Sequence, residues 1–372
     1  MSFLLRAFGK LTHAFAVIAI CTTVLSTRQL LFGQGNAYSI TELSGDSKAQ
    51  VACKLNNLGD IVGRADTIEK GESRAAIWKQ SNLSLRHLSA FSASDYSSAF
   101  GINDTGEVAG VSNTSNAMVP FVWTEKTGLG RVPLLPGDDC GQAFAINKHG
   151  HVVGYSSGRT GPKAFLWTRT GRVRNLGILP GGDHSRARDL NDWDEVVGTS
   201  ASAAGDRAIL WTRTGTVRDL GTLPGDKSSE GVAINNDGDV VGNSKGPTIT
   251  RAFLWTKGNG MEELGVLAGG NSNQARDIND LGAIVGSSTS SSGDHAFIWT
   301  RQAGMRDLNS AASAALGLVL IEAHAINSKG EIIAMGRSMH GVDMNSAMTS
   351  GATQYCAPAP PSIYLLTPET AR

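Results

Sequence analysis

The chain has 372 residues, with 33 basic and 33 acidic side chains, so its formal net charge is zero. A neutral chain has no large electrostatic field to draw it to nucleic acid or to an anionic membrane surface. Charged residues make up 18% of the chain, below the roughly 25% of typical globular domains. The 45 glycines favour many short strands joined by tight turns, and they argue against a helical protein.

Residues 1–36 differ from the rest of the chain. Arg6 and Lys10 precede the apolar run AFAVIAICTTVL at 14–25, a pattern typical of a secretory signal peptide and too short for a membrane span. We expect cleavage between residues 26 and 37, which leaves an extracellular or periplasmic chain with no transmembrane segment. An uncleaved N-terminal anchor is the alternative.

The four cysteines lie far apart, with no CxxC pair and no metal-ligand spacing: they are Cys21, Cys53, Cys140 and Cys356. Removal of Cys21 with the signal peptide leaves at most one disulfide. The sequence leaves open whether Cys53 pairs with Cys140.

An internal repeat dominates the rest of the sequence, and such a period must be sought before other patterns. Six tryptophans are spaced by 45, 44, 44, 44 and 44 residues: Trp78, Trp123, Trp167, Trp211, Trp255 and Trp299. An Ile-Asn or Leu-Asn dipeptide recurs with its Asn at Asn56, Asn103, Asn147, Asn191, Asn235, Asn279 and Asn327. A Gly three residues later, Asp194 in one copy, precedes a pair of mostly β-branched residues. These are seven copies of one unit.

Each unit contains four predicted strands, a to d, separated by turns rich in Gly, Asn and Asp. In the sixth unit they are 275–279, 283–288, 295–300 and 305–309. About 44 residues for four strands is the spacing of a β-propeller blade. We therefore predict an all-β fold, a β-propeller of four-stranded blades. Seven blades are favoured over six or eight.

The two ends of the chain are expected to complete the last blade together. The segment SIYLLTP (362–368) matches strand c with Leu366 at the Trp position, and YSITELSG (38–45) resembles a strand d without its own blade. Pairing of strand 38–44 with strand 362–367 would close the ring and leave no unpaired radial edge. The predicted propeller spans 37–368, with an insertion at 337–361 and a tail at 369–372.

Two positions in each unit fit radial packing. The residue four before the Asn is always small: Ala52, Ala99, Ala143, Ala187, Gly231, Ala275 or Ala323. We expect this because innermost strands crowd around the axis. The Trp of strand c is large enough to fill the gap between blades.

The segments KAFLWT (163–168), RAFLWT (251–256) and HAFIWT (295–300), with RDLGTLPG and AINNDGDVVG, resemble the HAF-repeat extracellular proteins. The resemblance covers essentially the whole predicted mature chain. It implies an exported bacterial repeat protein and transfers no catalytic residues. Blade one is the weakest match, because RAAIWK (74–79) lacks the Phe and the following Thr.

Several apparent active sites have structural interpretations. GYSSG (154–158) and GNSKG (242–246) match a nucleophile elbow, which requires a strand–turn–helix. The same Ser recurs in five blades, as Ser112, Ser156, Ser200, Ser244 and Ser288, so we expect these serines to end strand b. His149 and His151 lack a nearby third zinc ligand, and we expect two solvated turn residues.

The stretch AINNDGDVVG (233–242) could be a calcium loop or a hairpin turn. The positions of Asp237 and Asp239 hold Leu281 and Ala283 in blade six, and the Glu expected at the end of a calcium loop is missing. We therefore interpret it as the a–b hairpin, where Asn caps its own turn and Gly takes positive φ. We expect no metal and no cofactor.

Candidate ligand contacts lie where d–a and b–c loops gather around the axial opening. The d–a loops differ between blades at Asp138, Asp139, Asp183, His184, Asp226, Lys227 and Asn271. A cation or His295 precedes strand c in most blades, at Arg74, Lys163, Arg207, Arg251 and His295. These side chains either pair with acids such as Asp219 or Asp307 of strand d or form a basic ring on a ligand face.

Three functions remain open from the sequence, because a fold does not settle a function. The leading hypothesis is an exported, non-catalytic binding module that uses one propeller face for a glycan, a peptide or a surface partner. The second is a propeller enzyme of the hydrolase, lyase or lactonase kind, acting on an extracellular carbohydrate or ester. The third is a purely structural role. We see no single-copy cluster of catalytic residues, and we expect Asp189 and Asp277 to form ion pairs between blades.

Overall fold

The computed structural model describes residues 38–43, 49–67, 72–91, 96–114, 117–309, 316–338 and 361–369. The predicted signal peptide, Cys21, Cys356 and nearly all of the predicted insertion lie outside these residues. The described secondary structure consists of strands alone. None of the described residues forms a helix long and apolar enough to cross a membrane.

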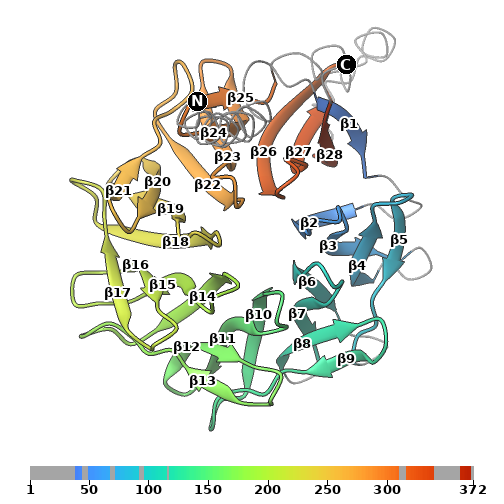
Figure 1. The fold of residues 1–372 in the computed structure, drawn as a ribbon, viewed down its shortest axis with the longest axis vertical. Coiled ribbons are helices and arrows are strands. Elements are labelled where there is room, and N and C mark those ends of the chain that lie inside the picture. The colour runs from blue at the N-terminus through green and yellow to red at the C-terminus, as the bar shows by residue number, and fades with distance from the viewer. Residues whose placement is uncertain are drawn as a thin grey trace, which may run out of the picture. The chain divides into compact units, whose positions relative to one another are not determined.

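Residues 39–367 form one compact unit, in which seven four-stranded antiparallel sheets surround an axis (Figure 1). The fold is a seven-bladed β-propeller, as the sequence predicts. The blades, each given from its innermost strand a outward, are as follows. Blade one has β2 (Ala49–Leu55), β3 (Ile61–Asp66), β4 (Ser73–Lys79) and β5 (Ser84–His87). Blade two has β6 (Ser97–Ile102), β7 (Val108–Asn113), β8 (Met118–Thr124) and β9 (Gly128–Arg131). Blade three has β10 (Cys140–Ile146), β11 (Val152–Gly158), β12 (Gly161–Trp167) and β13 (Val173–Asn175).

The remaining blades follow the same order. Blade four has β14 (Ser185–Leu190), β15 (Val196–Ser200), β16 (Arg207–Trp211) and β17 (Val217–Gly221). Blade five has β18 (Ser228–Ile234), β19 (Val240–Lys245), β20 (Thr250–Thr256) and β21 (Gly260–Glu263). Blade six has β22 (Asn273–Ile278), β23 (Ile284–Ser290), β24 (Gly293–Thr300) and β25 (Gly304–Asp307). Blade seven has β26 (Leu318–Ile326), β27 (Ile332–Ser338), β28 (Ser362–Pro368) and β1 (Tyr38–Glu42).

Blade seven is completed by the N-terminal strand, as predicted. Its order is β26–β27–β28–β1, so β28 takes the place of strand c and β1 that of strand d. The amide of Leu43 donates to the carbonyl of Ile363 at 2.8 Å, and Leu366 pairs with Ile332 at the position that Trp occupies in other blades. Both ends of the propeller are therefore held in one sheet.

The blades pack through apolar clusters that the repeated residues build. Trp211 of β16 contacts Val153 and Leu166 of blade three, and Trp78 of β4 contacts Ile333 of blade seven. The prediction that Trp fills the gap between blades is confirmed, although Trp167 and Trp299 stay half-buried.

The small residue of strand a is buried in every blade, but not for the predicted reason. A Cβ on Gly231 would lie 2.4 Å from Cγ2 of Val197 in the preceding blade. Ala187 likewise packs against Val153 of the blade before it. The size limit therefore comes from strand b of the neighbouring blade, and the axis is lined by the other face of strand a.

The repeated Asn closes each a–b hairpin. In blade five, Oδ1 of Asn235 accepts hydrogen bonds from the amides of Asp237 at 3.1 Å and Asp239 at 2.9 Å. Gly238 has a φ of +81°, which glycine adopts without steric cost. Blade four has Asp194 at this position with a φ of +60°. The interpretation of AINNDGDVVG as a hairpin is confirmed.

Candidate functional site

The seven a–b hairpins are joined into a closed ring around the axis by the same Asn side chains. Nδ2 of each Asn donates to the main-chain carbonyl of the corresponding Asn in the next blade, at 2.9 to 3.3 Å. The last bond, from Asn327 to Asn56, crosses from blade seven to blade one at 3.0 Å. Each Asn is buried, so the side chain that shapes its own turn also locks adjacent blades together.

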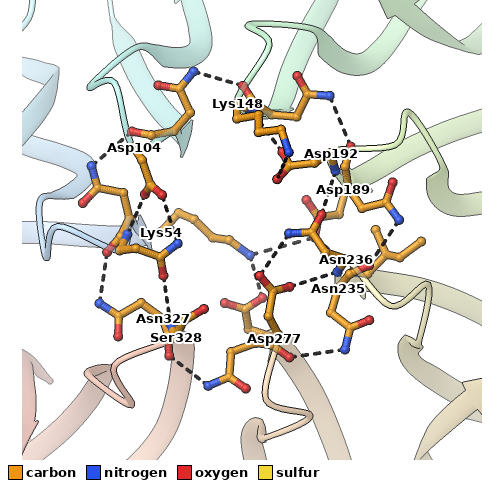
Figure 2. Close-up of a pocket in the computed structure, with 18 of the residues that line it drawn as sticks. Lys54, Asp104, Lys148, Asp189, Asp192, Asn235, Asn236, Asp277, Asn327 and Ser328 are labelled. Atoms are coloured by element: carbon orange, nitrogen blue, oxygen red, sulfur yellow. Dashed lines mark hydrogen bonds and ion pairs between the residues drawn. The ribbon is translucent and has the colours of Figure 1, made fainter.

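A polar opening lies at this ring, lined by all seven blades with a volume of about 170 Å³. The residue after each Asn surrounds it: Asn57, Asp104, Lys148, Asp192, Asn236, Asp280 and Ser328. Many of these side chains accept a hydrogen bond from the preceding blade, such as Asp280 Oδ1 from the amide of Asn236 at 2.9 Å. Figure 2 shows Asp104, Lys148, Asp192, Asn236 and Ser328 around the opening. We call the side of the propeller with the a–b turns the turn face, and the side with the d–a and b–c loops the loop face.

Three charged side chains meet inside this opening. Lys54 extends from β2 across the axis toward β22 and β14 (Figure 2). Its Nζ lies 2.6 Å from Oδ1 of Asp277 and 4.0 Å from Oδ2 of Asp189. The Asp277 side chain is only 2% exposed. Each acid also accepts an amide of the next blade: Asp277 from Ile326 at 3.0 Å and Asp189 from Ile234 at 3.2 Å. Blades one, four and six are therefore tied across the axis.

Burial sets the protonation behaviour of this group. Burial raises the pKa of Asp189 to about 6, against the lowering effect of Lys54, and the neighbouring Asp277 raises it further. The pKa of Lys54 is raised above its usual value, because the attraction of Asp277 and Asp189 outweighs the effect of burial. Lys54 thus stays charged at neutral pH, whereas Asp189 changes its protonation state near pH 6.

The axis carries a single-copy charged cluster that the sequence analysis did not identify. The two acids do form ion pairs between blades, but their shared partner is Lys54. Comparison of the seven copies at the position two before the Asn would have found it. That position holds Lys54, Gly101, Ala145, Asp189, Ala233, Asp277 and Ala325, so three charges stand among four small residues.

The channel toward the loop face is also asymmetric. The guanidinium of Arg188 lies 5.1 Å from the ring centroid of Phe144, and that of Arg186 lies 5.2 Å from the ring centroid of Tyr155. The rings of Phe144 and Tyr155 are themselves 5.9 Å apart. On the opposite side, Arg276 pairs with Glu322, and Nε2 of His324 lies 3.4 Å from Oε2 of Glu322.

Burial lowers the pKa of His324, and the charge of Arg276 lowers it further against the attraction of Glu322. This side of the channel therefore consists of a neutral imidazole and a neutralised Arg–Glu pair. The other side carries Arg186 and Arg188, neither of which forms an ion pair within the described residues.

The predicted d–a loop candidates occupy different environments. Asp138 and Asp226 point into the protein, where Asp138 accepts the Ser156 hydroxyl at 2.8 Å and Asp226 pairs with Arg251 at 2.9 Å. Asp183 and His184 line one open groove with Arg159 and Arg186. The others lie exposed on separate loops, without forming a common cavity: Asp139, Lys227 and Asn271.

The basic side chains that precede strand c are mostly paired with acids. His295 Nδ1 lies 2.6 Å from Asp307 Oδ2 of strand d, and Arg251 lies 3.0 Å from Glu263 of strand d, as the pairing alternative predicts. Arg207 donates instead to main-chain carbonyls, including that of Lys227 at 2.9 Å. Asp219 accepts the amide of Gly221 at 2.8 Å, so it is not the partner of Arg207.

The repeated serines hold the d–a loops in place. Ser156 Oγ accepts the amide of Leu135, and Ser244 Oγ accepts that of Leu223, both at 3.0 Å. Both serines are fully buried near the end of strand b, which confirms the structural interpretation. His149 and His151 stay in the turn, where His151 Nδ1 lies 2.8 Å from Oδ1 of Asp194. Within the described residues, no three His, Cys, Asp or Glu side chains are placed to hold a metal.

Cys53 and Cys140 are not joined to each other; both are free thiols. Burial raises the pKa of Cys53 to about 12. Burial also raises the pKa of Cys140, with further contributions from Asp139 and Asp138. Neither thiol is therefore a ready nucleophile at neutral pH.

The turn face carries an exposed tryptophan that the repeat analysis missed. Trp193 is 56% exposed at the second residue after its Asn, and its Nε1 donates to the carbonyl of Asn236 at 2.9 Å. Lys148 Nζ lies 5.4 Å from the ring centroid. The composition indicates this residue, because the chain has seven tryptophans and the repeat accounts for only six of them.

No protein-family model matches the chain, and no curated protein matches it in sequence. Among crystal structures, the chain is similar to virginiamycin B lyase from Staphylococcus aureus, at 12% identity and a TM-score of 0.54 over 89% of this chain and 99% of that one. It is also similar to oligogalacturonate lyase from Vibrio parahaemolyticus, at 11% identity and a TM-score of 0.52 over 88% and 93% of the two chains.

The β-propeller domain of the Trilobed protease from Pyrococcus furiosus is similar as well, at 9% identity and a TM-score of 0.51 over 78% and 90% of the two chains. Identities this low show the propeller fold alone. The function must be argued from the residues of this chain.

Proposed function

We propose that this chain is an exported, non-catalytic binding module of the HAF-repeat kind, and that it docks a protein partner on its turn face. Export rests on the signal-like pattern of residues 1–36. The choice among glycan, peptide and surface partners rests on the side chains that the turn face exposes.

One observation carries the proposal. The described part of the chain exposes four large apolar side chains, and three of them stand at the same turn position in blades one, four and six. They are Leu58 at 57%, Trp193 at 56% and Leu281 at 43%. The three blades are not adjacent, so these side chains surround the polar opening, and only a partner that spans the opening could cover all three. Leucine contributes contact area without hydrogen bonds, which favours a protein partner over a glycan.

The surroundings of Trp193 resemble the centre of a binding interface. Its indole is fixed by the hydrogen bond to Asn236, so little side-chain entropy is lost when a partner covers it. Tryptophan is enriched among residues that carry most of the binding energy. The polar opening beside it supplies amides and carboxylates for hydrogen bonds around the apolar contacts.

The state of the axial charges also supports a binding function over catalysis. Lys54, Asp277, Arg276 and Glu322 are each engaged in an ion pair. The repeated serines are buried, and in the described structure no hydrogen bond joins one of their hydroxyls to an imidazole. These contacts stabilise the blades, which supports the binding function over the enzyme alternative.

The test compares the chain with its Leu58→Ser/Trp193→Ser/Leu281→Ser variant on peptide and glycan arrays. Leu316→Ser is the matched control, because Leu316 is 58% exposed but does not belong to an a–b turn. We expect peptides to bind the chain and the control alike, and the triple variant at least about 150-fold more weakly, since each of the three anchors contributes about 1–2 kcal/mol. Binding to glycans alone, or peptide binding that the triple variant retains, would contradict the proposal. Binding to neither array would favour the structural role.

A further inference from the structure

The axial channel holds two arginines that the proposed function does not use. We propose that Arg186 and Arg188 form a binding site for the carboxylate group of a small organic anion. The space beside Arg188 shares Lys54 and Asp189 with the opening at the turn face, and Arg186 lines a separate groove on the loop face. A site for a small anion goes beyond the docking of a protein partner on the turn face.

Strand β14 places both guanidinium groups on the same side. Successive side chains of a strand alternate between its two faces, and the burial pattern of β14 follows this rule. Ser185 and Ala187 are buried, whereas Arg186 and Arg188 are exposed. Both arginines therefore leave the strand on the face that lines the channel.

Aromatic rings from blade three hold the two arginines in place. Arg188 lies over Phe144 and Arg186 over Tyr155, and the ring of Phe100 lies 5.5 Å from that of Phe144. A guanidinium stacked on a ring keeps its N–H groups at the edge, free for an acceptor. The planar fork of these donors matches the two oxygens of a carboxylate.

The charge of these two arginines is not neutralised within the described part of the chain. Neither makes an ion pair there, in contrast to Arg276, which pairs with Glu322. Among the acids, Glu230 has the largest effect on the pKa of Arg188, which it raises. Its carboxylate, however, lies 3.2 Å from Lys245 Nζ. Burial, together with the charges of Arg186 and Arg276, lowers the pKa of Arg188. A bound anion would relieve this repulsion.

Two cavities give an anion access to the arginines. Arg188 lines a space of about 90 Å³ inside the channel with Phe100, Phe144 and Val232. A water molecule needs only roughly 10–15 Å³ of such space, so a carboxylate group fits. Arg186 lines an open groove of about 510 Å³ on the loop face, together with Arg159, His184 and Asp183, whose carboxylate lies 2.7 Å from Nδ1 of His184. The two arginines are two residues apart on β14, so one strand presents a guanidinium to each of the two spaces.

The acids nearby favour a single negative charge over a phosphate dianion. Asp189 lines the same space as Arg188, and Lys54, which also lines it, is engaged by Asp277. The arginines thus supply two uncompensated positive charges, and Asp189 and Glu230 oppose a ligand of higher charge. A monocarboxylate meets this balance.

The experiment is isothermal titration calorimetry of the chain at low ionic strength with benzoate and glucuronate. Benzamide and glucose are the neutral probes, and inorganic phosphate is the dianion. We expect at least one of the two carboxylates, benzoate or glucuronate, to bind. The neutral probes should not bind, and phosphate should bind more weakly than that carboxylate. Arg188→Gln and Arg186→Gln should each weaken carboxylate binding at least tenfold. Arg188→Lys should also weaken it, because it keeps the charge and loses the fork.

The matched control is Arg218→Gln. Arg218 also stacks on an aromatic ring, 4.8 Å from the centroid of Trp255, but it lies on the outer strand β17. It should leave carboxylate binding unchanged. The proposal is overturned if neither carboxylate binds, if phosphate binds more tightly than both, or if folded Arg186→Gln and Arg188→Gln variants bind as the unaltered chain does. If one of the two variants does not fold, the other decides.

Discussion

Replacement of Lys54 by methionine tests the charged cluster on the axis. The substitution keeps the length of the side chain and removes the only cation within reach of Asp277 and Asp189 in the described structure. Removal of one partner from a buried ion pair costs about 3–5 kcal/mol, because the other charge stays buried and unpaired. The Lys54 side chain is 30% exposed, so solvent reduces this figure, and we expect a loss of about 2–3 kcal/mol at pH 7.5.

The effect should depend on pH in a defined direction. Lys54 lowers the pKa of Asp189, so its removal raises that pKa further above the unfolded value of 3.8. A carboxyl whose pKa is higher in the folded state binds its proton more tightly there, and this favours folding as the pH falls. The difference in stability between Lys54→Met and the unaltered chain should therefore shrink as the pH falls from 7.5 to about 6, the pKa of Asp189 in the unaltered chain, and Asp189 should change it little at lower pH.

The assay is urea unfolding followed by tryptophan fluorescence, with the midpoint as the readout. Lys245→Met is the matched control, because Lys245 pairs with Glu230 at 3.2 Å but is 49% exposed. Such a surface pair contributes at most about 1 kcal/mol. The double variant Lys54→Met/Asp277→Asn should recover more than half of the loss, because it removes the unpaired acid. If Lys54→Met unfolds at the midpoint of Lys245→Met, or if Asp277→Asn rescues nothing, the reasoning is refuted.

Three further predictions follow from the same contacts. Asp189→Asn should abolish a loss of stability of about 3 kcal/mol that the unaltered chain shows as the pH rises from about 4 to about 6. Urea midpoints across that range measure it, and an unchanged pH profile would contradict the raised pKa. Asn235→Ala removes hydrogen bonds to Asn279, Asp237 and Asp239 and should cost about 2–3 kcal/mol in thermal unfolding. Asn235→Asp, which keeps the acceptors, should cost less. Deletion of 362–372 removes β28 from between β27 and β1 and should lower the Tm of the whole propeller in one cooperative transition; a Tm equal to that of the full chain would disprove the closure.

Much of the candidate site could have been found in the sequence, but only after the repeat was aligned column by column. Trp193 and Lys54 each differ from the residues at the same position of most other repeat units. Trp193 is a tryptophan outside the 44-residue spacing, and Lys54 is a cation at a position where four units have a small residue. The alignment identifies such exceptional residues, but it does not show which of them lie close together in the folded chain. Asp138 and Asp226 share one aligned position with Gly182 and Gly270, yet both point inward to hydroxyl or guanidinium partners.

The sequence by itself determined the propeller, its seven blades and the pairing of its two ends. It could do so because each blade repeats the same local requirements: an Asn that closes a turn, a glycine with positive φ and alternating apolar residues. The tertiary structure alone decided what the ring brings together. Lys54 lies 223 positions from Asp277 along the chain, and the Asn side chain bonds to the next blade as well as to its own turn. Local patterns carry no information on distances across the axis, because those distances exist only once all seven blades have closed.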